Sequence, residues 1–178
     1  ANVRVAALEA LGAIGVLRVD DARPLLLSRL DTSQPLEALA ALESLAMIGA
    51  SLPFTTVRPW LSDPLLGRAA LALAAESGEP QAAAPLFAAF LSGRDPEAVC
   101  ALSDYVRASE GARRAALAEL VNAGPRAEAL LLACLERRDG DVEYARAALS
   151  VVGALGIAVG AELAVSWLAD ARCYAEAD

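Results

Sequence analysis

A short motif recurs five times in this chain of 178 residues: Ala-Ala-Leu, with a glycine seven residues after the leucine. Five copies in so short a sequence indicate an internal repeat, and periods of about 20–50 residues are typical of repeat architectures. The motif therefore predicts an array of similar helical units. The five leucine–glycine pairs are Leu8 and Gly15, Leu42 and Gly49, Leu71 and Gly78, Leu117 and Gly124, and Leu149 and Gly156.

Each copy has the apolar pattern of a helix that packs closely against its neighbours. A leucine lies three positions after the motif leucine in three copies, with Val152 and Ala74 as variants, and a large apolar residue lies directly before the glycine in three copies. This spacing places them on one helical face. The paired alanines leave room for a second helix to approach. The glycine is expected to end the helix, because it adopts a left-handed conformation without strain. The apolar residues on this face are Leu11, Leu45, Leu120, Ile14, Ile48 and Leu155.

Shorter helices are expected between the motif helices, with aspartate and proline marking several of the turns. Asp31, Asp63 and Asp95 follow one another at a spacing of 32 residues, which we interpret as the repeat length. Aspartate and proline favour the first turn of a helix. The pattern predicts helices near 2–14, 20–29, 35–49, 53–61, 63–78, 80–91, 97–109, 112–123, 125–137, 142–155 and 161–169.

The repeat is irregular near residues 97–124. Cys100, Ala101 and Leu102 form a degenerate copy of the motif, but Leu117 follows too soon to leave room for an intervening helix. The helices at 97–109 and 112–123 therefore both have the pattern of a motif helix. One of the two must take a different role, and the sequence does not say which.

The first copy resembles a known repeat family. Val3-Arg4, Ala6-Ala7, Ala10-Leu11-Gly12 and Ile14-Gly15 are similar to the second helix of a HEAT repeat, particularly the bacterial HEAT-like repeats that also occur in phycobilin lyases. The resemblance extends through the five copies over most of the chain. It implies an all-α, right-handed solenoid of about five HEAT-like hairpins, in which the motif helices line the concave face. We expect one such domain over residues 1–178, belonging to a longer array.

Arginines recur at the start of the motif helices and are candidates for a binding surface. On the concave face they would grip an acidic peptide or a carboxylate. The structural alternative is that they reach an aspartate of an inter-helix turn, Asp63 or Asp141, and hold the repeats together. The candidates are Arg68, Arg114 and Arg146, directly before the motif, and Arg4 and Arg113, one position earlier.

Tyr144 is a further candidate for this concave surface, because aromatic side chains often anchor protein partners. Trp60, Tyr105 and Trp167 share this interpretation, and packing between helix layers is the alternative for all four. Phe87 and Phe90, three residues apart on one helix, are expected in the core.

Catalysis is disfavoured by what the sequence lacks. There is no histidine, so there is no histidine base, no Ser-His or Cys-His pair and no histidine metal ligand. The carboxylates of Asp139, Asp141 and Glu143 do not complete a calcium-binding loop. Cys100, Cys134 and Cys173 are expected to be buried free thiols. We therefore expect no enzyme activity, no metal and no cofactor.

The net charge of −8 disfavours nucleic acid and anionic lipid as partners. Because no stretch has the length and bulk of a membrane span, we expect a cytoplasmic protein. The favoured function is a non-catalytic scaffold that binds a protein or peptide. An accessory role in prosthetic-group attachment, suggested by the phycobilin-lyase resemblance, is the alternative, and nucleic-acid binding is a second one. Exposed apolar ends of the solenoid are expected to favour self-association.

Overall fold

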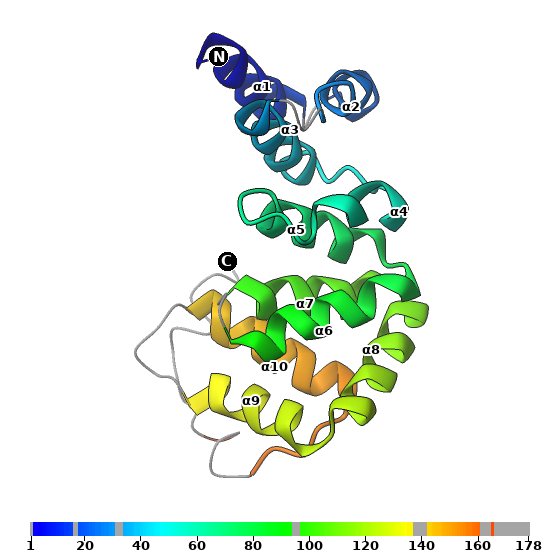
Figure 1. The fold of residues 1–178 in the computed structure, drawn as a ribbon. Coiled ribbons are helices and arrows are strands. Elements are labelled where there is room, and N and C mark those ends of the chain that lie inside the picture. The colour runs from blue at the N-terminus through cyan, green and yellow to red at the C-terminus, as the bar shows by residue number, and fades with distance from the viewer. Residues whose placement is uncertain are drawn as a thin grey trace. The chain divides into compact units, whose positions relative to one another are not determined.

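All regular secondary structure that the structure describes is helical. The computed structural model describes residues 2–15, 18–30, 34–93, 97–136, 142–160 and 165. These ranges contain ten α-helices and two short 3-10 helices, and no strand (Figure 1). The expected all-α class is therefore confirmed. None of the helices in the described ranges is long and apolar enough to cross a membrane.

The helices fall into two compact units, Ala1–Ala82 and Ala83–Asp178. The first unit contains α1 (Asn2–Gly15), α2 (Val19–Leu27), α3 (Pro35–Met47), α4 (Phe54–Val57), η1 (Arg58–Trp60), α5 (Gly67–Ser77) and η2 (Pro80–Ala82). The second contains α6 (Ala83–Ser92), α7 (Glu97–Ala108), α8 (Glu110–Ala123), α9 (Pro125–Glu136) and α10 (Val142–Leu155).

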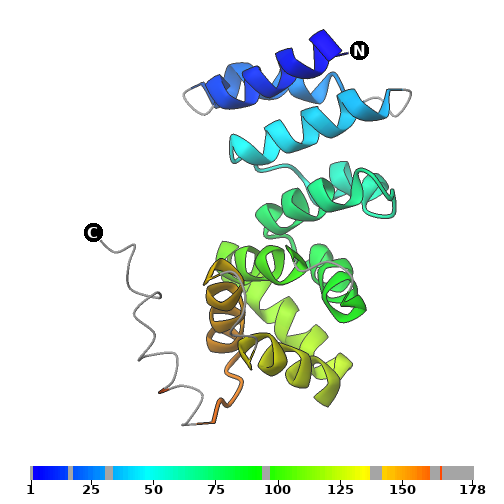
Figure 2. The ribbon, with the colours of Figure 1, turned by 90° about the vertical axis from the view of Figure 1, so that its left-hand side faces the viewer.

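In the first unit, the three motif helices pack in succession. Helix α3 contacts α1 on one side and α5 on the other, while α2 packs against α1 and α3, and α4 against α5 (Figure 2). Leu42 and Leu45 of α3 have no exposed surface, and neither do Ala41 and Ala70. Small alanine side chains thus lie where the helices meet, as the motif predicts.

The motif glycines lie at the ends of their helices, and four of the five have the expected left-handed conformation. The φ angle is positive at four of them: 62° at Gly49, 61° at Gly78, 64° at Gly124 and 68° at Gly156. Gly15 is also the last residue of α1, but it has no positive φ, so the expected left-handed conformation is wrong there. A Cβ atom at Gly15 would lie 2.8 Å from the Cβ of Ala22. Glycine is needed there for close packing of α1 against α2.

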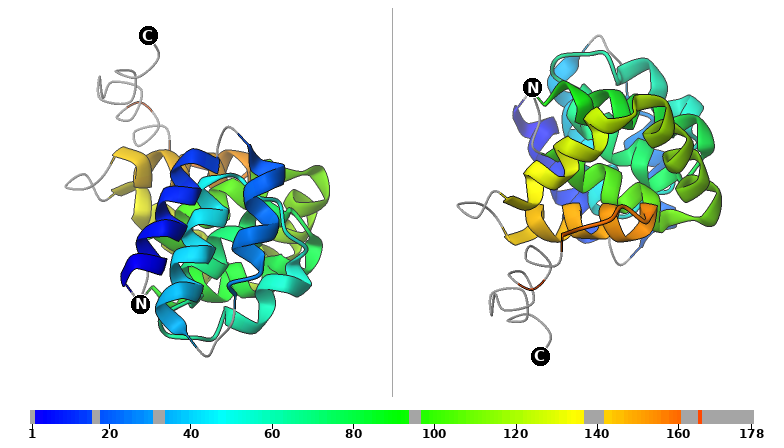
Figure 3. Two further views of the ribbon diagram at one scale, coloured as in Figure 1. Left: turned by 90° about the horizontal axis from the view of Figure 1, so that it is seen from above. Right: turned by 90° about the horizontal axis from the view of Figure 1, so that it is seen from below.

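In the second unit, α8 is the helix that leaves the pattern. Helix α7 packs directly against α10, whereas α8 packs mainly against α6 and α7 and has smaller contacts with α9 and α10 (Figure 3, right). Ser109 alone separates α7 from α8, and its Oγ accepts a hydrogen bond of 2.9 Å from the N–H of Ala112. This N-cap starts α8 at Glu110, two residues earlier than predicted. The motif residue Leu117 is consequently 44% exposed, while Leu42 and Leu71 are buried.

Other predicted elements differ from the structure in local detail. The predicted helix at 53–61 is divided into α4 and η1. Helix α5 begins at Gly67 because the Oδ1 of Asp63 accepts hydrogen bonds from the N–H groups of Leu65 and Leu66, which closes a turn first. Phe87 and Phe90 are buried, as predicted. Several predictions fall on residues that the structure does not describe. They concern Asp139, Asp141, Trp167, Cys173 and the helix at 161–169, of which only Val165 is described.

Candidate binding site between α7 and α10

An open pocket lies in the second unit between α7 and α10. Its volume is about 380 Å³. Four of its side chains belong to α7 and occupy positions i, i+3, i+4 and i+7, so they share one face of that helix. The lining residues are Cys100, Ser103, Asp104 and Arg107 of α7, and Arg146, Ala147 and Ser150 of α10.

The opposite face of α7 holds this polar face in place. Val99, Leu102 and Val106 of α7 are almost completely buried, as is Tyr105. An apolar face of this kind fixes the rotation of a helix about its axis, because any other rotation would expose it to water. The pocket residues of α7 are therefore positioned by the core beneath them.

Opposite charges face one another inside the pocket. Partial burial raises the pKa of the Asp104 carboxyl above its ordinary value, and the positive charge of Arg107 offsets part of this rise. Arg146 brings a second guanidinium group from α10. The pocket thus combines two cationic groups, one carboxylate and two serine hydroxyl groups, contributed by two different helices.

The side chains of this pocket can form charged hydrogen bonds with a ligand. Guanidinium groups donate paired hydrogen bonds to carboxylates, whereas Asp104 and the serine hydroxyls accept hydrogen bonds from N–H groups. Cys100 contributes a thiol that is half-buried, where full burial was expected. Within the described part of the chain, no cluster of three or more carboxylate or thiol side chains could hold a metal ion.

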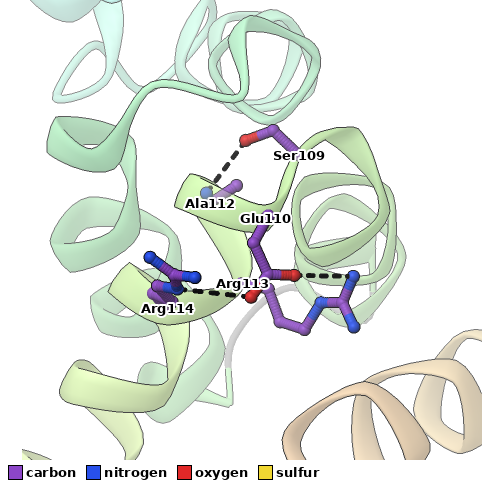
Figure 4. Close-up of polar contacts among 5 residues, drawn as sticks. All are labelled: Ser109, Glu110, Ala112, Arg113 and Arg114. Carbon is purple, nitrogen blue, oxygen red and sulfur yellow. Dashed lines mark hydrogen bonds and ion pairs between the residues drawn. The ribbon is translucent and has the colours of Figure 1, made fainter.

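Arg146 is the sequence candidate that lies in this pocket. Arg113 and Arg114 lie elsewhere, on α8, where both pair with Glu110 of the same helix (Figure 4). The distances to the Glu110 carboxylate oxygens are 3.1 Å from Arg113 and 3.2 Å from Arg114, and all three side chains are exposed. Neither arginine lines the pocket between α7 and α10.

Arg4 links two helices of the first unit. Its Nε donates to the carboxylate of Glu37, and its Nη2 donates to the Oε1 of Gln34 at 2.9 Å. The Glu37 side chain is only 7% exposed, whereas that of Arg4 is 58% exposed. Arg4 thereby neutralises a buried carboxylate and connects α1 to the start of α3. This is a structural role of the kind considered for the repeated arginines, with a glutamate as the partner.

Replacing Arg4 by glutamine is expected to destabilise the chain by about 1 kcal/mol, because Glu37 then loses its cationic partner in a largely buried position. A double-mutant cycle with Glu37→Gln, followed by urea unfolding, measures the coupling between the two side chains. A coupling near zero would show that the pair contributes nothing to the packing of α1 on α3.

The two other candidates occupy different surroundings. Arg68 is exposed in the first turn of α5, in the first unit. Tyr144 is half-buried, and its hydroxyl lies 3.0 Å from the Sγ of Cys134, which joins α10 to α9. Cys134 is a buried free thiol, as predicted. The contact between Tyr144 and Cys134 favours packing between helices as the role of Tyr144.

The α7 residues of the pocket were not among the candidate site residues predicted from the sequence. A signal was present, because Cys100, Ser103, Asp104 and Arg107 form a polar stripe with helical spacing. The arginines attached to the motif were the predicted candidates, and α7 carries only a degenerate copy of the motif. Its neighbour α10 lies far along the chain, so sequence spacing alone does not bring the two together.

Comparison with known proteins adds no relative. No family model matches this chain, and neither a curated protein nor a solved structure matches it.

Proposed function

We propose that this chain is a non-catalytic binding module that holds an acidic segment of a partner protein in the pocket between α7 and α10. The observation that carries the proposal is the presence of Arg107 and Arg146, from two different helices, in one open pocket. A carboxylate between two guanidinium groups gains strong, directional hydrogen bonds.

The remaining lining favours a peptide over a simple anion. Asp104 is a hydrogen-bond acceptor beside Arg107, and its negative charge opposes a single group that carries two negative charges, such as a phosphate, more than it opposes one carboxylate. The backbone N–H groups of a peptide can donate to Asp104 and to the hydroxyls of Ser103 and Ser150. A peptide with an aspartate or glutamate side chain therefore matches both kinds of group.

The HEAT-like, right-handed solenoid is part of the same proposal. Its support is the packing of motif helices side by side, α1 with α3 and α3 with α5 in the first unit, and α7 with α10 in the second. Packed helices present side chains in fixed positions, which reduces the ordering that binding requires. In this arrangement the α7–α10 pocket belongs to the concave face, where repeat proteins commonly bind extended segments.

A binding assay with charge-neutral variants tests the proposal. The probe is a fluorescein-labelled peptide of alternating glutamate and glycine, measured by fluorescence anisotropy at low salt. We expect Arg107→Gln and Arg146→Gln each to weaken binding by about 5–30-fold, which corresponds to the loss of one charged hydrogen-bonding partner. Added salt should weaken binding by the wild-type chain as well.

Arg114→Gln is the matched control, because Arg114 is exposed, carries the same charge and lies outside the pocket. It should leave the dissociation constant unchanged, and all variants should melt like the wild-type chain. If Arg114→Gln weakened peptide binding equally, the loss of affinity would depend on the net charge of the chain and not on the pocket. Unchanged binding by the Arg107 and Arg146 variants would reject the pocket as the site.

A further inference from the structure

The pocket between α7 and α10 presents opposite charges next to each other on one helix. Asp104 and Arg107 both line the pocket, and they lie three residues apart on α7. Residues at this spacing are neighbours on the surface of a helix, with about 5–6 Å between their Cβ atoms. Both residues are exposed, whereas Val106 between them is buried. A ligand in the pocket therefore meets a fixed order of negative and positive charge.

The charge of Asp104 is only partly compensated by Arg107. Partial loss of water raises the pKa of the Asp104 carboxyl, and the positive charge of Arg107 offsets part of this rise. A cation brought by a ligand would compensate the carboxylate further, since charged donors form stronger hydrogen bonds than neutral N–H groups do. A second carboxylate at the same place would be repelled. Asp104 thus favours a positive charge in the ligand and opposes a negative one.

The two arginines of the pocket favour the opposite sign of charge. Arg107 belongs to α7 and Arg146 to α10, so an acidic side chain of the ligand has a guanidinium partner on either helix. A specific site discriminates best when it attracts the right ligand and also repels the wrong one. This pocket does both, because the arginines repel a purely basic segment and Asp104 opposes a purely acidic one.

An extended peptide can match this arrangement of charges. Side chains alternate along an extended chain, so residues two positions apart point the same way and lie about 6–7 Å from each other. This distance is close to the spacing of Asp104 and Arg107 on α7. A segment in which one residue separates an acidic residue from a basic one can therefore place its carboxylate at Arg107 and its cation at Asp104. Both charge pairs then form at once.

We propose that Asp104 is a specificity-determining residue, which selects a partner segment whose acidic residue and basic residue are separated by one residue. The inference rests on the proposed function, and it names the chemical class of the segment that the pocket holds. Because the pocket is open to solvent, each charge pair contributes modestly to the affinity. The selection is therefore a difference in affinity between segments with and without the basic residue.

Two fluorescein-labelled peptides with the repeated sequence Glu-Gly-Lys-Gly test the proposal, one with free lysines and one with acetylated lysines. Acetylation removes the positive charges and leaves the glutamates in place. Binding to the full chain is measured by fluorescence anisotropy at low salt and neutral pH. We expect the wild-type chain to bind the lysine peptide about 3–10-fold more tightly than the acetylated one. Asp104→Asn should melt like the wild-type chain and lose most of this preference.

Glu128→Gln is the matched control, because Glu128 of α9 is exposed, lies outside the pocket and loses the same charge on substitution. The control is needed because the net charge of −8 attracts any lysine peptide. Glu128→Gln should keep the preference for the lysine peptide. An equal loss of preference in Asp104→Asn and Glu128→Gln would assign it to net charge and overturn the inference.

Arg146→Gln distinguishes failure of this inference from failure of the proposed function. It should weaken the binding of both peptides, since both contain the glutamates. If it does so while Asp104→Asn keeps the full preference for the lysine peptide, the inference is wrong and the proposed function stands. If neither peptide binds, or if Arg146→Gln weakens neither of them, both proposals are wrong.

Discussion

Replacing Gly12 by alanine is expected to lower the free energy of unfolding by about 1–3 kcal/mol, although alanine is the better helix former. A Cβ atom at Gly12 would lie 2.7 Å from the Cβ of Ser44 and 3.0 Å from its Cα. The obstructing atoms include the backbone of α3, so α1 and α3 would have to move apart. That movement would also strain the hydrogen bond between Ser44 and Leu8.

The same substitution at Gly153 provides the control, and its effect should have the opposite sign. Gly153 lies inside α10, and a Cβ atom there would meet nothing within 4 Å. Gly153→Ala should therefore raise the free energy of unfolding by about 0.5–1 kcal/mol, through helix propensity alone. Urea unfolding of the two variants beside the wild-type chain measures both changes. Stabilisation by Gly12→Ala would mean that α1 does not pack on α3 as closely as described.

Ionisation of Tyr105 is expected to destabilise the chain at alkaline pH. The side chain has no exposed surface. Burial, and to a smaller extent the negative charge of Glu119, raise the pKa of its hydroxyl from 10.0 to about 12. The folded chain thus retains this proton more tightly than the unfolded chain does. Its stabilising effect is complete below about pH 10 and is lost as the pH rises toward 12.

A pKa difference of this size corresponds to roughly 2–3 kcal/mol of unfolding free energy. Urea unfolding of the wild-type chain and of Tyr105→Phe, repeated between neutral pH and pH of about 12, measures it. The wild-type chain should lose more stability than the variant, and only above about pH 10. Parallel curves for the two chains would show that Tyr105 does not cause the alkaline loss.

Helix positions and most helix ends were predictable because they depend on local sequence. The range 142–155 was predicted for α10 and is observed, and Gly49, Gly78, Gly124 and Gly156 end their segments as the motif implies. Gly15 ends α1 without a positive φ, and the need for glycine there comes from its close approach to Ala22 and Ile48, which a local pattern does not contain.

The candidate site was less predictable because it joins distant parts of the chain. Arg146 was selected by its place before a motif, and it does line the pocket. Arg114 has the same place in its own motif but pairs with Glu110 on α8. The two arginines differ in their surroundings because α8 follows α7 after a single residue, with no helix between them. Helix α8 therefore does not take the position of a motif helix in the repeat. Residues that share a motif position therefore need not share a surface.

The direct packing of α7 against α10 also affects how the two units fold. In the first unit, each motif helix contacts the next one along the chain, so structure can spread from one repeat to its neighbour, as in one-dimensional models of repeat proteins. In the second unit, α7 packs against α10, and α8 and α9 lie between these two helices in the chain. Closing this longer loop costs chain entropy before the contact is made. We therefore expect the second unit to fold cooperatively, because α7 and α10 each supply part of the surface against which the other packs.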